Sequence, residues 1–187
     1  MEVKMDRNFR YDIMPEIKER WSPRAFSKNK ISRTDIHTVL EAARYAPSCF
    51  NEQPWRFLIA DKEDTLAKMR SILYESNQVW ANAAPVLILI CATKTFSQNG
   101  KDNYWHMFDA GTAWGYLSLE AQRLGLISHA MGGFSRKAAK EVFQIPDEVD
   151  IMAVVALGKM GDPSLLPEDL KKEEFPKTRM EIEDFLL

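Results

Sequence analysis

The apolar run PVLILICA, residues 85–92, is the feature that most constrains the fold of this 187-residue chain. The run is far shorter than the roughly 20 residues that a membrane-spanning helix needs. It is also too continuous for a strand with one face in water, so it predicts a strand over Val86–Thr93 that is covered on both faces. Ile151–Leu157 (IMAVVAL) is a second run of this kind, and Trp55–Ala60 (WRFLIA) predicts a further strand.

Segments with helical periodicity alternate with these strands. A helix is predicted to begin after Ser32, which is placed to cap it, and to end before Pro47. The segment Tyr104–Leu124 predicts a long, mostly buried helix, and Arg136–Phe143 predicts another behind Ser135. The element order indicates one α+β domain over residues 1–187, built as a three-layer α/β/α sandwich.

Glycines and the polar tail add two local expectations. Gly111 and Gly115 lower the helix propensity of the long segment, which suggests close packing against another backbone or a flat ligand, and Gly125 is suited to cap that helix. After Gly161 the chain is too polar to form a core, so it is predicted to wrap over the rest of the protein or over a partner subunit. The predicted anchors of this tail are Leu165, Leu166, Phe175, Phe185 and Leu186.

Composition and charge disfavour several classes of protein. A net charge of -2 gives no overall positive field to attract a polyanion, so nucleic-acid binding is not expected. Charges are scattered through residues 1–13, which argues against a secretory signal and, with the short apolar runs, against membrane association. With only Cys49 and Cys91 in the sequence, disulfides are not expected and a reducing cytoplasm is the simpler location.

Several common catalytic motifs are absent from the sequence. There is no GxGxxG dinucleotide fingerprint after a strand, no phosphate-binding P-loop and no GxSxG nucleophile elbow. His37, His106 and His129 are widely separated and lack the spacing of metal ligands, so no metal site is predicted.

Four separated segments combine polar side chains with turn-forming residues. Residues 20–26 (RWSPRAF) and residues 176–179 (PKTR) bring arginine and lysine, which suit a phosphate group. Residues 46–57 (APSCFNEQPWRF) carry amide side chains that can both donate to and accept from a heterocyclic ring, and residues 131–134 (MGGF) let backbone N–H groups approach a ligand. Each segment alone also fits an ordinary surface turn or loop, but their joint occurrence indicates a binding site.

These segments resemble the FMN-dependent nitroreductase family. RWSPRAF resembles the family's R-x-S-x-[RK]-x-[FY] signature, and APSCFNEQPWRF resembles its [AS]-P-S-x-x-N-x-Q-P-W block. LEAQRLGLISHAMGGF resembles the family's helix, Gly-Leu turn and glycine loop, whereas VVALGKMG and FPKTRMEIEDFL resemble its last core strand and basic C-terminal motif. The likeness extends from about Ile17 to the end of the chain, and the block around Asn51 is its most specific part.

The resemblance implies a nitroreductase-like fold with a central, mostly antiparallel sheet covered by helices. It also implies a homodimer with FMN at the interface and a C-terminal tail that extends over the partner subunit. The residues implied to bind FMN are Arg20, Ser22, Lys177 and Arg179 at the phosphate, Trp21 through its backbone, Arg24 near N1 and O2, Ser48, Cys49, Asn51 and Gln53 from the opposite subunit, and Gly132 and Gly133 at N5 and O4. No side chain is expected to act as a covalent catalyst, because the cofactor carries the chemistry.

The implied activity is electron transfer from NAD(P)H through flavin N5 to a small flat acceptor, such as a nitroaromatic or a quinone, by a ping-pong mechanism. Phe50, Trp105 and Phe108 could sandwich the acceptor, although core packing is the favoured role for the last two. A narrower relative remains an alternative, such as a dehalogenase, an enoyl reductase or a flavin-destroying enzyme. A non-catalytic FMN-binding protein and a ligand-free interaction domain are further alternatives.

The sequence departs from the family pattern at two positions. Cys49 stands where serine is common, and Ala130 stands where proline is frequent, so the setting of the flavin ring is left open. Asn77 and Asp109 could approach the flavin or the substrate. A helix cap for Asn77 and a solvated carboxylate for Asp109 are equally compatible with the sequence.

Overall fold

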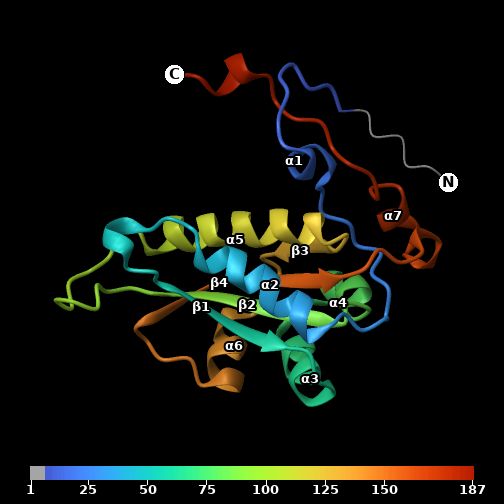
Figure 1. Ribbon diagram of the computed structural model, residues 1–187. Coiled ribbons are helices and arrows are strands. Elements are labelled where there is room, and N and C mark those ends of the chain that lie inside the picture. The colour runs from blue at the N-terminus through green and yellow to red at the C-terminus, as the bar shows by residue number, and fades with distance from the viewer. Residues whose placement is uncertain (1–6) are drawn as a thin grey trace.

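The computed structural model describes residues 7–187, and a four-stranded sheet lies at its centre (Figure 1). The strands are β1 (Trp55–Ala60), β2 (Val86–Thr93), β3 (Ile127–Met131) and β4 (Val149–Gly158), in the spatial order β1-β2-β4-β3. Every neighbouring pair is antiparallel, and Leu89 of β2 lies opposite Leu58 of β1 and Val154 of β4.

The expectation about a secretory signal concerns residues 1–13, of which residues 1–6 lie outside the described part of the chain.

Helices cover both faces of this sheet (Figure 1). On one face, Ile88 of β2 belongs to a core cluster with Val39 and Leu117. On the other face, Leu89 of β2 belongs to a cluster with Met69 and Trp80. The helices of the first face are α2 (Arg33–Arg44) and α5 (His106–Arg123), and those of the second are α3 (Glu63–Ile72), α4 (Glu75–Ala81) and α6 (Arg136–Phe143). This two-sided packing explains why Val86 to Ala92 are all buried, as the unbroken apolar run predicts.

The caps and bounds of several elements agree with the sequence predictions. The Ser32 hydroxyl accepts from the Asp35 N–H at the start of α2, and Ser135 caps α6 in the same way. Strands β1 and β2 have the predicted bounds, whereas β4 is longer than predicted at both ends. Helix α5 begins two residues later than predicted and is followed by Gly125 at φ 69°.

The prediction that α5 is mostly buried is wrong for the single chain. Ala113 and Leu117 face the core, but Trp105 and Phe108 are 57% and 71% exposed, so they do not take the core role that the sequence favours. No atom within 4 Å would meet a side chain placed at Gly111 or Gly115. The close packing expected at these glycines therefore does not occur within residues 7–187.

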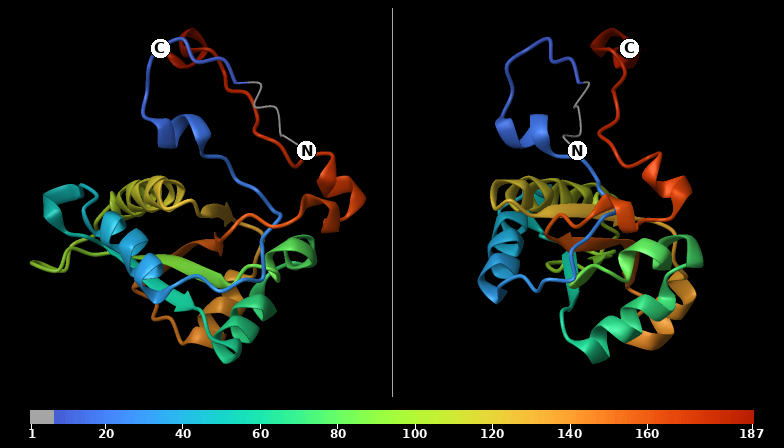
Figure 2. Two further views of the ribbon diagram at one scale, coloured as in Figure 1. Left: turned by 45° about the vertical axis from the view of Figure 1, so that its right-hand side comes forward. Right: turned by 90° about the vertical axis from the view of Figure 1, so that its right-hand side faces the viewer.

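The two ends of the described chain form arms that leave the body of the protein side by side (Figures 1 and 2). The N-terminal arm is residues 7–19, which include the short helix α1 (Pro15–Glu19), and the C-terminal arm is residues 175–187, which include η3 (Ile182–Phe185). Arg10 joins the arms through ion pairs with Glu181 at 3.4 Å and Glu183 at 2.7 Å.

The segment before the C-terminal arm contains η2 (Pro163–Leu165) and α7 (Glu168–Lys171). Leu166 is buried there, as predicted for an anchor of the tail. The other predicted anchors are exposed, so they do not hold the tail against this chain, and an anchoring role on a partner subunit stays a prediction; they are Leu165, Phe175, Phe185 and Leu186. No helix within residues 7–187 is long and apolar enough to cross a membrane.

Candidate functional site

The arginine segment, residues 20–26, begins where α1 ends. The backbone N–H of Arg20 donates to the Glu16 carbonyl, and Arg20 Nη1 lies 3.2 Å from the Trp21 carbonyl and 3.4 Å from Ser22 Oγ. At the other end of the segment, Phe26 forms an isolated bridge with Met160, just after β4. The segment is therefore held against the sheet while its first arginine faces the arms.

A buried carboxylate fixes the middle of this segment. One oxygen of Glu174 accepts the backbone N–H groups of Arg24 and Ala25, each at 2.8 Å. Glu174 is only 6% exposed, and it precedes the C-terminal arm. It therefore ties the arginine segment to the base of that arm, a role that no motif in the sequence indicates.

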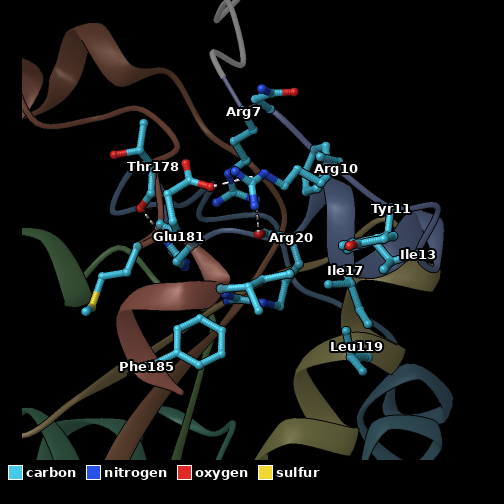
Figure 3. Close-up of a pocket in the computed structure, with 15 residues that line it drawn as sticks. Arg7, Arg10, Tyr11, Ile13, Ile17, Arg20, Leu119, Thr178, Glu181 and Phe185 are labelled. Atoms are coloured by element: carbon cyan, nitrogen blue, oxygen red, sulfur yellow. Dashed lines mark hydrogen bonds and ion pairs between the residues drawn. The ribbon is translucent and has the colours of Figure 1, made fainter. Parts of the chain in front are cut away.

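A cavity of about 790 Å³ lies between the two arms, and four arginines line it (Figure 3). One is Arg10, and the other three are Arg7 and Arg179, one from each arm, and Arg20 from the arginine segment. Burial, followed by the neighbouring positive charge of Arg179, lowers the pKa of both Arg7 and Arg20. Within residues 7–187, none of the three forms an ion pair with a carboxylate. Clustered guanidinium donors without a carboxylate partner fit a phosphate group.

Lys177 is not brought to this cluster, although the sequence groups it with Arg20. Its ammonium pairs with Glu173 and lies 3.6 Å from the centre of the Phe175 ring. Arg179 does line the cavity, with Nη1 bound to the carbonyls of Lys177 and Thr178.

The glycine loop follows β3, and its two glycines have different surroundings. The Gly133 carbonyl accepts from Tyr74 N–H at 3.1 Å and from Asn77 Nδ2 at 2.9 Å. A methyl carbon at Gly133 would lie 2.5 Å from Asn77 Nδ2, whereas one at Gly132 would meet nothing within 4 Å. Asn77 lies inside α4 and braces the glycine loop, so the alternative that it caps a helix is wrong.

Alanine substitutions at the two glycines are expected to separate folding from ligand binding. Gly133→Ala should lower the free energy of unfolding by about 1–2 kcal/mol, because Asn77 must move and lose its hydrogen bond. Gly132→Ala should leave the unfolding temperature of the apoprotein within about 2 °C and weaken only ligand binding at the open face of the loop. Thermal unfolding of both apoproteins checks this, and equal destabilisation by the two changes would contradict the assignment.

The loop between α2 and β1 has a strained backbone. It contains η1 (Cys49–Asn51), and Phe50, Asn51 and Gln53 have φ values of 51°, 58° and 52°. The Ser48 hydroxyl accepts from Gln53 N–H, and Gln53 Nε2 donates to the Asn51 carbonyl. Positive φ angles at non-glycine residues cost free energy and often mark functional positions. The Asn51 side chain makes no hydrogen bond within residues 7–187 and is exposed, so its amide is available to a ligand.

Asp109 holds this loop onto α5. Asp109 Oδ2 accepts from the Cys49 N–H at 3.1 Å, and the residue is 3% exposed, so the alternative of a solvated carboxylate is wrong. Its place in the first turn of α5 is favourable for a negative charge. Asp109 therefore positions the strained loop.

The loop and the arginine segment lie at opposite ends of α5 (Figure 1). Asp109 holds the loop near the start of the helix, whereas Leu119 lines the arginine cavity ten residues later. Ten residues of α-helix span about 15 Å. One chain therefore brings together the arginine segment, Arg179 and the arms, but it does not bring the 48–53 loop to them.

His129 lies on β3 beneath the arginine segment. Its Nδ1–H donates to the Pro23 carbonyl at 2.9 Å, and its ring lies 4.5 Å from that of Trp80. Burial lowers the pKa of His129, and the charges of Arg24 and Arg20 lower it further. The imidazole is therefore held neutral under the arginines. The sequence gives no sign of this role, because a lone histidine in a strand has no motif.

Stability is expected to depend on the charge of His129. Because its pKa is lower in the folded than in the unfolded chain, the unfolded chain takes up the proton first as the pH falls below about 6.5. The free energy of unfolding should then fall by up to about 1.4 kcal/mol per pH unit, and His129→Gln should remove that component. Chemical denaturation between pH 5 and about pH 8 measures it, with exposed His37→Gln as the control. Parallel pH profiles for wild type and His129→Gln would contradict this prediction.

The described residues contain no group of three or more histidine, cysteine, aspartate or glutamate side chains that could hold a metal ion.

The same fold occurs in oxidoreductases that contain FMN. A solved structure of an oxidoreductase containing FMN matches 100% of this chain and 96% of its own, with 37% identity and a TM-score of 0.93. A protein from Exiguobacterium sibiricum, named as a candidate nitroreductase and solved in complex with FMN, has the same fold, with a TM-score of 0.78 at 22% identity over 94% of this chain and 96% of its own. The fold is therefore that of a flavin-containing oxidoreductase.

The sequence comparisons place the chain in a family. The nitroreductase family model matches residues 17–79 and 70–159. A protein from Archaeoglobus fulgidus, named as a candidate NADH dehydrogenase/NAD(P)H nitroreductase, is 34% identical over 155 residues, which are 81% of this chain and 87% of the relative. The chain belongs to the nitroreductase family.

Proposed function

We propose that this protein binds FMN and transfers electrons from NAD(P)H to a small flat acceptor. The observation that carries the proposal is the cavity where Arg20 and Arg179 meet without a carboxylate partner, in a chain of the nitroreductase family. Bound FMN would supply a hydride acceptor at N5, which is chemistry that protein side chains lack. The chain's own residues bind and orient the cofactor and exclude water.

Each segment of the site has a proposed role toward FMN. Arg20, Ser22 and Arg179 would hold the phosphate, and Lys177 would join them after leaving its ion pair with Glu173. Arg24 would place positive charge at the N1–O2 edge of the ring, where negative charge gathers on reduction. The backbone N–H groups of Gly132 and Gly133 would face the N5 and O4 atoms. The residues proposed to contact FMN from the strained loop are Ser48, Cys49, Asn51 and Gln53.

We further propose that two chains complete each site as a homodimer. The strained loop lies at the other end of α5 from the arginines, so a single chain cannot close both around one ligand. One chain leaves apolar side chains exposed: Phe50 is 82% exposed and Phe185 is 60% exposed. A dimer would bury such a surface. A C-terminal arm that extends over the partner subunit would cover such a surface.

A complementation experiment tests whether the sites are shared. Arg20→Ala and Asn51→Ala homodimers should each lose most activity, because every site contains a substituted residue. If one subunit supplies Arg20 and the other Asn51, each mixed dimer has one intact site, and an equal mixture should regain about a quarter of the wild-type activity. Mixtures made by co-refolding would show no recovery if one chain built the whole site.

The proposed activity has a direct test. The purified protein should carry about one FMN per chain by its visible spectrum. Under anaerobic conditions, NADH or NADPH should bleach the flavin absorbance, and a nitroaromatic or quinone should restore it. A colourless protein that FMN cannot reconstitute would refute the cofactor. A bound flavin that neither nicotinamide reduces would instead favour a non-catalytic FMN-binding protein.

Reductive dehalogenation is a second candidate, because an iodotyrosine deiodinase from Thermotoga neapolitana is 26% identical over 178 residues, covering 82% of this chain and 89% of that protein. In that reaction two electrons and a proton replace an aryl carbon–halogen bond with carbon–hydrogen and release halide. Release of iodide from iodotyrosine, faster than reduction of nitroaromatics by the same preparation, would favour this candidate.

A further inference from the structure

Arg7 of the N-terminal arm lines the cavity and lies outside every motif of the sequence. We propose that Arg7 is a further phosphate-binding residue, which also positions Arg20 and so makes the site select FMN over riboflavin, its dephosphorylated form. The proposal rests on the proposed function and deepens it by assigning the recognition of the phosphate monoester to a third arginine.

The position of Arg7 is set by two backbone contacts. Arg7 Nη1 donates to the carbonyl of Arg20 at 2.8 Å (Figure 3) and to that of Lys18 at 3.1 Å. The carbonyl groups at the end of a helix lack partners within the helix, and α1 ends at Glu19. Arg7 therefore closes the end of α1 and fixes the point from which the Arg20 side chain enters the cavity.

The rest of the Arg7 guanidinium lacks a partner. Its Nε and Nη2 are buried and make no hydrogen bond within residues 7–187. Buried donors without acceptors are costly, and charged donors more so. Burial and the neighbouring charges of Arg179 and Arg20 lower the pKa of Arg7. Buried donors without an acceptor and an excess of positive charge therefore occur together in a residue that lines the cavity.

Arg10, the other arginine of the N-terminal arm, has its charge neutralised by carboxylates. It lines the same cavity, but its guanidinium pairs with Glu181 and Glu183 and is half exposed. The carboxylates of the C-terminal arm thus neutralise Arg10 and leave Arg7, Arg20 and Arg179 for an external anion. A phosphate monoester dianion has three oxygens that can accept from several guanidinium groups at once.

The experiment compares Arg7→Met with the matched variant Arg10→Met. Apoprotein would be titrated with FMN and with riboflavin, following the quenching of flavin fluorescence. We expect Arg7→Met to weaken FMN binding about tenfold and riboflavin binding less than twofold, because the loss concerns the phosphate. Arg10→Met should change the ratio of the two affinities less than threefold, because its exposed charge is paired and screened. Arg7→Lys should recover only part of the ratio, since an ammonium lacks the fork of donors.

A merely structural role for Arg7 would give another pattern. Equal losses for FMN and riboflavin, or unchanged affinity for both, would overturn the proposal. A lower unfolding temperature of the apoprotein with an unchanged affinity ratio would overturn it too, since Arg7 would then only brace α1. Inorganic phosphate should raise the unfolding temperature of wild-type apoprotein but not of Arg7→Met. This last measurement separates the two proposals. If phosphate raises the unfolding temperature of a protein that binds no flavin, the proposed function is refuted and the anion site is retained. If phosphate does not raise the unfolding temperature, the anion site is refuted.

Discussion

Arg20→Ala is expected to weaken FMN binding about 100-fold, a loss of about 3 kcal/mol. The reason is that Arg20 lies in the cavity with Arg7 and Arg179 and has no carboxylate partner, so its charge is directed to an anion from outside the chain. Charge-assisted hydrogen bonds to phosphate are about twice as strong as neutral ones. Fluorescence titration of the apoprotein with FMN measures the effect.

The stability of the apoprotein should not fall in the Arg20→Ala variant. Arg20 is partly buried, and Arg7 and Arg179 repel it, so alanine should leave the unfolding temperature of the apoprotein unchanged or slightly higher. Arg44→Ala is the control, because that arginine is exposed on α2 and paired with Glu41. Unchanged FMN affinity in Arg20→Ala would show that the cluster does not bind phosphate. A large loss of stability would show that Arg20 supports the fold instead.

The parts of the fold that follow from short-range patterns could be predicted from the sequence. Strand β2 is apolar and buried from Val86 to Ala92 because both its faces are covered, and such a run has few other interpretations. Ser32 and Ser135 cap helices through bonds to residues only three positions away. The arginine segment and the strained loop are also short, contiguous motifs, which is why their residues can be recognised as site candidates from the sequence alone.

The parts that depend on distant partners could not be predicted. Strand β3 has Ser128 and His129 at its centre, so it lacks an apolar pattern, and it is a strand because β4 pairs with it. Phe108 is apolar and lies in a helix, yet it is exposed, because the described part of the chain leaves this face of α5 uncovered. The contacts that sequence analysis missed have the same cause. Arg7, Asp109 and Glu174 act on backbone groups at least 11 positions away along the sequence, although Asp109 itself is a site candidate.

Glu174→Ala is expected to lower the free energy of unfolding by about 3 kcal/mol. The change leaves the N–H groups of Arg24 and Ala25 without their acceptor in a buried place, and each such loss costs about 1–3 kcal/mol. For a domain of this size, that corresponds to a fall in Tm of about 6–12 °C. Because the carboxylate joins the arginine segment to the base of the C-terminal arm, FMN affinity should fall as well. Thermal unfolding and FMN titration measure the two effects.

The adjacent glutamate provides a matched control, since Glu173 is exposed and its partner is Lys177. Glu173→Ala should change the free energy of unfolding by less than about 0.5 kcal/mol, which is usual for an exposed ion pair. Glu174→Gln keeps an oxygen that can accept both N–H groups but loses the negative charge, so it should cost less than alanine. Equal effects of Glu173→Ala and Glu174→Ala would mean that general acidity stabilises this end of the chain. A loss of stability confined to Glu174→Ala would instead assign the effect to one carboxylate, which connects its own segment to Arg24 and Ala25, 150 and 149 positions earlier in the sequence.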